Sequence, residues 1–358
     1  MSINVTKPYL PPLQEYIGYL EGIWERGWLT NNGPLVQQLE TELSAALSGG
    51  LVQFMSNGTI ALQVAIKALE LTGEIITTPF SYVATTTAIL WEGCEPVFVD
   101  IEEQSFCIDA TKIEAAITPR TSAILATHVY GYPCDVLAIE DIARRHNLKV
   151  IYDGAHAFGV TVHGRSLLTY GDITTCSFHA TKLFHTSEGG AIITTSEELA
   201  KKVWLYKSFG HIGDEYFSLG VNGKNSEFHA AMGLCNLPRV PEFIAARRQV
   251  AELYQAELAS LNLRYPVTPP ATEYNYSYFP IILESEEQMQ LVKDTLAAHD
   301  VNTRRYFFPS LNKLPYHTGA DCPVSEDISL RVLCLPFYQQ LEHDEVRRIS
   351  QLIKEALA

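Results

Sequence analysis

One lysine stands out because of the residues on either side of it. Lys182 lies in a polar turn between an apolar and β-branched run that ends at Phe178 and a second apolar run over residues 191–195. A lysine held between two strands is expected to be half-buried, and burial lowers the pKa of its amine by desolvation. A neutral amine can form a Schiff base with an aldehyde cofactor or a carbonyl substrate. Most lysines in such turns are simply solvated, so Lys182 alone is only a candidate catalytic residue.

A carboxylate follows a neighbouring apolar segment. Asp153 comes directly after the strand predicted over residues 149–152 and precedes Lys182 by 29 residues, a separation compatible with adjacent strands. The usual role of a carboxylate in this position is to cap the next turn. The other interpretation is that Asp153 pairs with the ring nitrogen of a cofactor and keeps that nitrogen protonated.

A third feature is a turn suited to a phosphate group. The strand predicted over residues 51–55 runs into Ser56-Asn57-Gly58-Thr59, and a helix is predicted over residues 60–71. Free backbone N–H groups at a helix N-terminus form an anion site, although Ser, Asn and Thr are also ordinary helix caps. Tyr82 supplies an aromatic ring for stacking. Pyridoxal 5′-phosphate needs a Schiff-base lysine, an acid for its ring nitrogen, a phosphate site and a stacking ring, so the four together favour this cofactor.

The elements predicted around these residues explain how they could meet. Strands over residues 74–78, 95–99, 122–127 and 149–152 alternate with helical segments, which indicates an α/β fold with a mostly parallel sheet. Ligands of such sheets bind beyond the carboxyl ends of the strands. The turn at Ser56, Tyr82, Asp153 and the Lys182 turn all follow strands, so we expect them to converge on one cavity.

The chain is long enough for two domains. A long helix predicted over residues 241–261 leads into strand and helix patterns at residues 276–283, 288–299 and 346–357. We therefore predict a large domain over residues 1–240 and a smaller C-terminal α+β domain over residues 241–358.

The composition and the absence of other motifs narrow the class of protein. The net charge of −15 argues against a nucleic-acid partner. Seven cysteines without a CxxC pair indicate free thiols in a reducing, cytoplasmic compartment, and no apolar run predicts a signal peptide or a membrane partner. No GxGxxG, GxSxG, HExxH or metal-spaced Cys/His pattern is present, so no metal site is predicted.

Several segments, taken in order, carry a family resemblance. Over nearly its full length the chain resembles the DegT/StrS family of fold type I, pyridoxal phosphate-dependent nucleotide-sugar aminotransferases. It departs from the usual family pattern at Gly154, where a larger residue is common, and at Asn225, where Met is common. The matching segments are Gly27-Trp28-Leu29-Thr30-Asn31-Asn32-Gly33-Pro34, Ser56-Asn57-Gly58-Thr59, Pro79-Phe80-Ser81-Tyr82, His128-Val129-Tyr130-Gly131, Asp153-Gly154-Ala155-His156-Ala157, Ser177-Phe178-His179-Ala180-Thr181-Lys182, Glu188-Gly189-Gly190-Ala191 and Asn222-Gly223-Lys224.

The resemblance implies a role for each site residue. It implies that Lys182 bonds to the cofactor and then moves a proton between the cofactor and the sugar carbon, and that Asp153 holds the proton of the ring nitrogen. It places His156 near the 3′-oxygen of the cofactor. The remaining implied roles are phosphate binding by Gly58, Thr59 and Ser177, ring stacking by Tyr82, and phosphate binding by Asn222 from the neighbouring subunit of a symmetric homodimer.

The resemblance also implies a reaction. L-Glutamate would donate its amino group to C4 of a dTDP-4-keto-6-deoxyhexose, giving dTDP-4-amino-4,6-dideoxyglucose for surface-polysaccharide synthesis. The turn from His179 to Gly190 and the segment over residues 302–309 resemble the subgroup with that product. The arginines of the latter segment either face the diphosphate and base or are structural.

Other reactions stay open at this point. Enzymes that aminate C3 share most of the motifs, and a regulatory member could bind ligand without turnover. Family dehydratases replace the lysine with His, whereas Lys182 is present. Cysteine desulfuration and aldol cleavage are further reactions of the same fold, but the segments at Trp28 and Asn222 argue against them.

Overall fold

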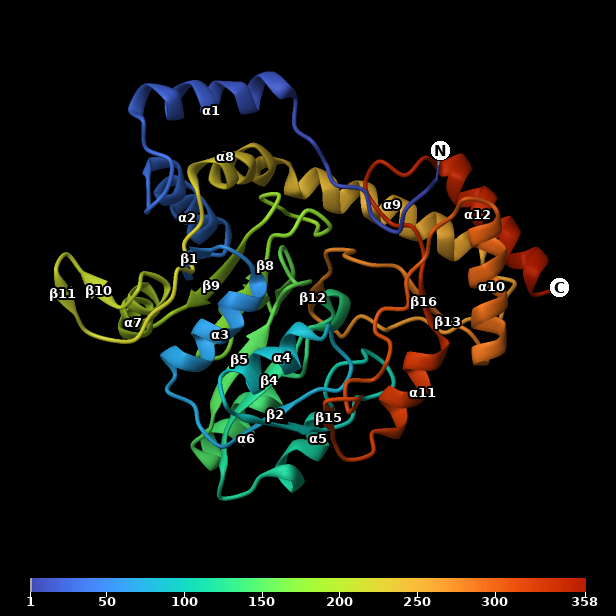
Figure 1. Cartoon of the computed structure of the whole chain (residues 1–358). Helices are drawn as coiled ribbons and strands as arrows, with labels where there is room; N and C mark the ends of the chain where they lie inside the picture. The colour runs from blue at the N-terminus through green and yellow to red at the C-terminus, as the bar shows by residue number, and fades with distance from the viewer. Residues whose placement is uncertain (1) are drawn as a thin grey trace.

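A seven-stranded sheet forms the centre of the computed structural model, which describes residues 2–358 (Figure 1). Six of its strands are parallel to one another, and β9 alone runs antiparallel to both of its neighbours. The predicted α/β fold with a mostly parallel sheet is confirmed. The strand order is β1 (Leu51–Met55), β9 (Gly190–Thr194), β8 (Ile173–Ser177), β5 (Lys149–Asp153), β4 (Thr121–Thr127), β2 (Glu74–Thr77) and β3 (Glu95–Phe98).

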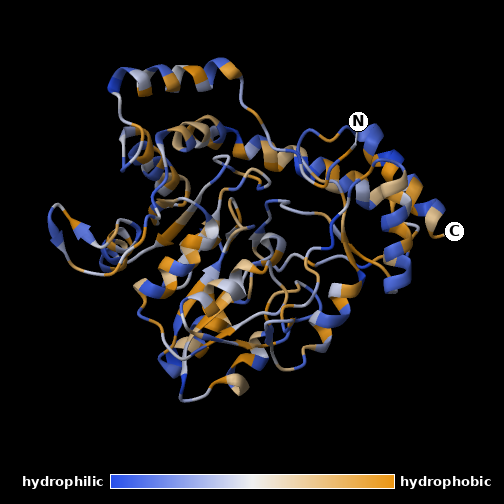
Figure 2. Ribbon diagram, in the orientation of Figure 1, coloured by the Kyte–Doolittle hydropathy of each residue, from blue (hydrophilic) through white to orange (hydrophobic). Residues whose placement is uncertain are grey.

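Helices cover both faces of this sheet because its strands are apolar on both sides. Side chains alternate between two clusters: Ile75 and Ile151 pack on one face, whereas Ile76 and Val150 pack on the other. Figure 2 shows the central strands as the most hydrophobic part of the ribbon. One face is covered by α3 (Gly58–Ala68), α4 (Ala84–Trp91) and α7 (Glu197–Lys207), and the other by α2 (Pro34–Ala46), α5 (Ala110–Ile113), α6 (Val136–His146) and α8 (Glu227–Asn236).

The direction of the strands brings the predicted site residues to one edge. Because β1, β8, β5, β4 and β2 are parallel, their carboxyl ends lie along the same edge of the sheet. The turn before α3, the segment with Tyr82, Asp153 and the Lys182 turn all begin at this edge. The sheet therefore positions the residues that the sequence singled out.

The C-terminal part has a core of its own. Residues of α9 (Val240–Glu257), α10 (Glu286–Ala298) and α12 (His343–Ala356) pack with β13 (Pro280–Ile282) and β16 (Val332–Cys334), which pair antiparallel. Ile3 joins this cluster and forms a bridge to Val301, so the start of the chain packs on its C-terminal part. The predicted domain boundary near residue 240 stays a prediction.

Smaller elements complete the structure. Helix α1 (Leu13–Arg26) lies at the top of Figure 1, and the hairpin of β10 (His211–Ile212) and β11 (Glu215–Tyr216) projects at the left. Between residues 2 and 358, no helix is both long and apolar enough to cross a membrane. The remaining elements are β6 (Thr161–Val162), β7 (Arg165–Ser166), β12 (Thr272–Glu273), β14 (Lys313–Leu314), β15 (His317–Thr318) and α11 (Pro323–Arg331).

Two sequence-based expectations for the elements need correction. The strand predicted over residues 276–283 is paired only over Pro280–Ile282, because the backbone carbonyls of Tyr276 and Ser277 instead accept bonds from the side chain of Arg247. Helices α7 and α11 were not among the predicted elements. Only Val203 and Lys207 of α7 are buried, so its apolar periodicity is weak.

Candidate active site

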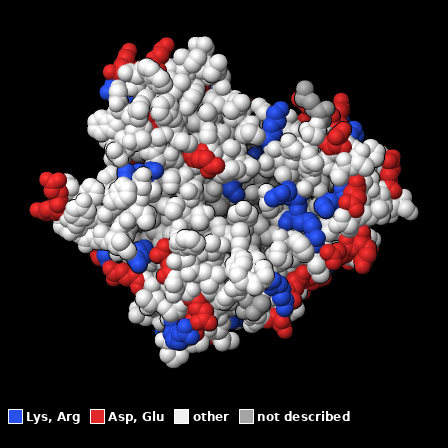
Figure 3. Space-filling view, in the orientation of Figure 1, with Lys and Arg blue, Asp and Glu red and all other residues white. Residues whose placement is uncertain are grey.

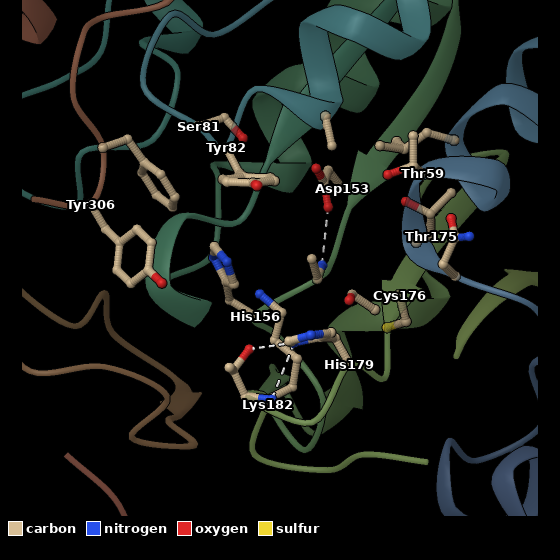
Figure 4. A pocket seen from close by; sticks show the side chains of 18 of the residues that line it. Thr59, Ser81, Tyr82, Asp153, His156, Thr175, Cys176, His179, Lys182 and Tyr306 are labelled. Atoms are coloured by element: carbon tan, nitrogen blue, oxygen red, sulfur yellow. Dashed lines mark hydrogen bonds between the residues drawn. The ribbon is translucent and has the colours of Figure 1, made fainter. Parts of the chain in front are cut away.

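A cavity of about 300 Å³ opens at the carboxyl edge of the sheet. Figure 4 shows Lys182, Asp153, His156, Tyr82 and Thr59 around it, each carried by a different strand end, turn or helix start. Gly58 and Ser177 line it as well. Seven of the eight predicted site residues thus meet in one cavity, and Asn222 does not.

Lys182 reaches the cavity from the turn that follows β8. Its backbone N–H donates to the carbonyl of His179 at 2.9 Å, which closes the turn. Burial lowers the pKa of the Lys182 amine, and the charge of Asp153 works in the opposite direction. The amine is therefore closer to the neutral, nucleophilic form than a lysine in water.

Asp153, the last residue of β5, is buried at the end of a chain of hydroxyl groups. Thr127 donates to Ser81 at 3.0 Å, the Ser81 and Thr85 hydroxyls are 2.8 Å apart, and Thr85 donates to Oδ2 of Asp153 at 2.8 Å. The Ala155 N–H donates to Oδ1 at 3.1 Å. Burial raises the pKa of Asp153, while Thr85 and Ala155 lower it. These donors favour the carboxylate and oppose the effect of desolvation, which favours the protonated acid.

His156 is held as a neutral ring with a known tautomer. Its Nδ1 accepts the backbone N–H of Tyr130 at 3.2 Å, so the ring proton is on Nε2. Burial lowers the pKa of His156 well below its ordinary value. The ring lies parallel to Phe307, with centroids 5.7 Å apart and an interplanar angle of 11°. His156 can therefore offer an Nε2–H donor without carrying a charge.

The start of α3 fits an anion. The side chain of Asn57 accepts the Ile60 N–H at 2.9 Å, whereas no partner is recorded within residues 2–358 for the N–H groups of Gly58 and Thr59. A Cβ added to Gly58 would lie 3.0 Å from Cβ of Ser177. The glycine thus lets the helix start approach β8 closely, and the cavity meets the positive end of the helix dipole.

Of the remaining two predicted site residues, Tyr82 lies in the cavity and Asn222 lies outside it. Tyr82 lines the cavity, and 56% of its surface is exposed. Asn222 is exposed outside the cavity, where its backbone forms a bridge to Ser208. Gly223, beside it, accepts the N–H of Ser56 at 2.8 Å, so this segment is tied to the turn before α3.

The cavity also contains residues to which the sequence assigned no role. Of the hydroxyl relay formed by Thr127, Ser81 and Thr85, only Ser81 lines the cavity, and its place in a matching segment gave no indication that it acts on Asp153. Tyr278 and Glu188 line the cavity too, and Tyr278 comes from the C-terminal part of the chain. Of the segment over residues 302–309, Arg304, Tyr306 and Phe307 line the cavity.

Packing accounts for the two departures from the family pattern. A Cβ added to Gly154 would meet Cδ2 of Leu168 at 2.5 Å, so Leu168 occupies the space of a larger side chain at residue 154. Asn225 donates from Nδ2 to the carbonyls of Met55 and Glu188, each at 3.1 Å. Asn225 thereby ties the end of β1 to the segment that carries Glu188.

Comparisons with known proteins decide the family. Residues 13–354 match the model of the DegT/DnrJ/EryC1/StrS aminotransferase family. The chain belongs to this family. As a family member it is a pyridoxal phosphate-dependent aminotransferase, and no part of its sheet, cavity or site conflicts with that assignment.

The relatives of this aminotransferase cover its whole length. It is 43% identical to a dTDP-4-amino-4,6-dideoxy-D-glucose transaminase from Shigella dysenteriae, over 99% of this chain and 98% of that protein. It is 40% identical to a transaminase of the same name from Escherichia coli, over 98% of both chains. The crystal structure of DesI in the presence of its TDP-sugar product has a TM-score of 0.94 and 33% identity, over 99% of this chain and 92% of that one.

The residues of this aminotransferase fit its cofactor. The open N–H groups before α3 suit a phosphate, the buried and hydrogen-bonded Asp153 suits a protonated ring nitrogen, and the Lys182 amine suits an aldehyde. The cavity is large enough for such a ring and has aromatic walls. The individual roles of these residues stay predictions.

The hydroxyl relay allows a direct test of Asp153. We expect Thr85→Val to weaken the binding of pyridoxal phosphate about 10-fold or more, since a hydrogen bond to a charged group contributes about 1.5–3 kcal/mol. The loss of affinity should grow as the pH falls. Without the Thr85 donor, the Asp153 carboxylate binds a proton at a higher pH than it does in the native protein. The dissociation constant can be measured by fluorescence titration of the cofactor-free protein.

Thr86→Val is the matched control for this titration. Thr86 is equally buried and adjacent, but its hydroxyl has no partner among the described residues. Its replacement should leave cofactor affinity unchanged. Equal losses in the two variants would show that the relay does not act on Asp153.

Proposed function

We propose that this aminotransferase moves the amino group of L-glutamate to C4 of a dTDP-4-keto-6-deoxyhexose, forming dTDP-4-amino-4,6-dideoxyglucose for surface-polysaccharide synthesis. The observation that carries the proposal is that Lys182 and Asp153 line one cavity and act electrostatically on each other, in a chain 43% identical to a transaminase named for that product. Amination at C3 has less support, because both relatives described above are named for a 4-amino sugar.

The cofactor and the protein divide the chemistry between them. When bound, pyridoxal phosphate supplies an aldehyde that carries the amino group and a ring that withdraws electrons from the reacting carbon. Asp153 holds a proton at the ring nitrogen through its carboxylate, and His156 donates from Nε2. The N–H groups of Gly58 and Thr59, together with Ser177, bind the phosphate.

Lys182 moves the proton. A proton carrier works best when its pKa lies near the working pH, and burial moves the Lys182 amine in that direction. The turn closed by His179 fixes the backbone of Lys182, and the side chain extends into the cavity. Nζ can therefore accept a proton from one carbon and return it to another.

Arg304 supports a nucleotide-sugar substrate. Figure 3 shows Lys and Arg gathered around the hollowed middle of a molecule whose net charge is −15. Arg304 lines the cavity with its guanidinium carbon 5.4 Å from the centre of the Tyr306 ring, and its side chain has no hydrogen bond or ion pair to the residues that the structure describes. An uncompensated guanidinium at a cavity mouth suits the two negative charges of a diphosphate. Its neighbour Arg305 instead pairs with Glu286 at 3.1 Å.

A homodimer with shared active sites would explain why Asn222 lies outside the cavity of its own chain. The hairpin arm and its flanks expose large apolar side chains that a single chain leaves uncovered: Ile212, Tyr216, Phe217 and Leu219. Asn222 lies at the base of this arm. In a symmetric dimer, an exposed residue beside an apolar surface can reach the site of the partner.

The reaction can be tested on the purified protein. With glutamate and the dTDP-4-keto-6-deoxy sugar, we expect a product whose amino group is on C4 by nuclear magnetic resonance. Glutamate alone should shift the visible absorption band of the bound cofactor, and Lys182→Ala should abolish both the band and turnover. A product aminated at C3 would contradict the regiochemistry, and a protein that takes up no cofactor would contradict the enzyme assignment.

Mixed dimers test the shared site. Lys182→Ala and Asn222→Ala should each be nearly inactive as homodimers. If Asn222 serves the partner subunit, a mixed dimer contains one site with both residues intact, so co-expression should restore about a quarter to half of the native activity. Activity no higher than that of the single variants would place Asn222 in the site of its own chain or outside both sites.

Paired arginine variants test the diphosphate contact. We expect Arg304→Met to raise KM for the nucleotide sugar about 10- to 100-fold, since a charge-assisted contact contributes about 1.5–3 kcal/mol. KM for glutamate, measured in the separate half-reaction, should stay the same. Arg305→Met should change neither value. A higher KM for glutamate alone would instead indicate that Arg304 binds the carboxylate of the amino donor.

A further inference from the structure

A short segment of the C-terminal part is fastened to the cofactor site. Asn275 donates from Nδ2 to the carbonyls of His156 at 2.8 Å and Phe158 at 2.9 Å. The Ser277 hydroxyl donates to the same His156 carbonyl at 2.6 Å. These three bonds fix the backbone of residues 275–278 against the loop that follows Asp153. The next side chain, Tyr278, is thereby delivered into the cavity.

The ring of Tyr278 has little freedom there. It is 8% exposed and packs edge-on against His156, with centroids 4.9 Å apart and an interplanar angle of 72°. Tyr130 and Tyr306 contact it on other sides, each with centroids 5.6 Å away. Because both the backbone and the ring are fixed, the position of the phenolic oxygen is fixed as well.

That oxygen faces the Lys182 amine. Nζ of Lys182 lies 3.4 Å from the Tyr278 hydroxyl and 5.9 Å from the centre of its ring. Within residues 2–358, the Tyr278 hydroxyl is the one hydrogen-bond partner recorded for this amine. No motif singled out Tyr278, which lies 96 residues from Lys182 in the chain.

We propose that Tyr278 is a positioning residue whose hydroxyl holds the Lys182 amine whenever that amine is not bonded to a carbonyl group. The proposal rests on the proposed role of Lys182 as proton carrier. A hydroxyl suits this task because it accepts a bond from an ammonium group and donates one to a neutral amine. A carboxylate in the same place would favour the ammonium alone and would work against proton release.

Tyr278→Phe tests the proposal because it keeps the packed ring and removes only the hydroxyl. The bond to an ammonium is charge-assisted and stronger than the bond to a neutral amine, so its loss disfavours the ammonium. In holoenzyme reconstituted with pyridoxamine 5′-phosphate, Lys182 has no aldehyde to bond. We expect the pH of half-maximal acylation of Lys182, followed by mass spectrometry, to fall by about one pH unit in the variant.

Kinetics give the second measurement. Both half-reactions should slow about 10-fold in kcat with KM for glutamate and for the nucleotide sugar unchanged, because substrate binding is not affected while the amine loses its fixed position. The melting temperature should stay that of the native protein.

Tyr276→Phe is the matched control on the same fastened segment. Tyr276 does not line the cavity and packs against Tyr274. Its variant should match the native enzyme in the acylation profile and in both rates. An unchanged acylation profile in Tyr278→Phe, or equal effects of the two variants, would overturn the positioning role. Full turnover by Lys182→Ala would instead overturn the proposed function on which it rests.

Discussion

The parallel pairing of β5 with β8 is the constraint on which the rest of the site depends. In this register Asp153 pairs with Thr175, so Ser177 lies two residues further along β8 and the Lys182 turn follows directly. An acid and an amine are thereby held at one edge of the sheet, within electrostatic reach of each other. Burial disfavours the charged form of both groups, and the charge of each partly offsets that effect on the other.

Much of this arrangement could be predicted from the sequence because it is local and periodic. Strands β2, β4 and β5 are apolar in the middle and end in a polar residue, and the shared direction of the parallel strands places Asp153, Tyr82 and Lys182 at one edge. The individual roles of these residues needed the family resemblance. The sequence patterns of one chain do not show where Asn222 lies relative to an active site, because its proposed contact is with the cofactor of a second chain.

Contacts between distant parts of the chain were beyond the reach of sequence patterns. Tyr278 enters the cavity because Asn275 and Ser277 bond to carbonyls that lie more than 100 residues away in the chain. A further distant contact explains why residues 276–278 do not pair as the predicted strand: the backbone carbonyls of Tyr276 and Ser277 accept from the side chain of Arg247. Apolar periodicity describes which face of an element is buried, but it carries no information about such partners.

A segment that matches the family pattern can have a structural role instead of a catalytic one. Glu227 is fully buried and accepts hydrogen bonds from the backbone N–H groups of Leu35 at 3.0 Å and Val36 at 2.9 Å. These N–H groups have no partner inside α2, because the helix begins at Pro34. A Cβ on Gly33 would lie 2.5 Å from Cδ of Glu227, so only glycine admits this carboxylate. The start of α2 is thus tied to the start of α8, close to the Asn225 bridge that reaches Glu188 at the cavity. Packing at helix ends therefore accounts for part of the pattern at residues 27–34, and it supports the cavity from outside rather than entering it.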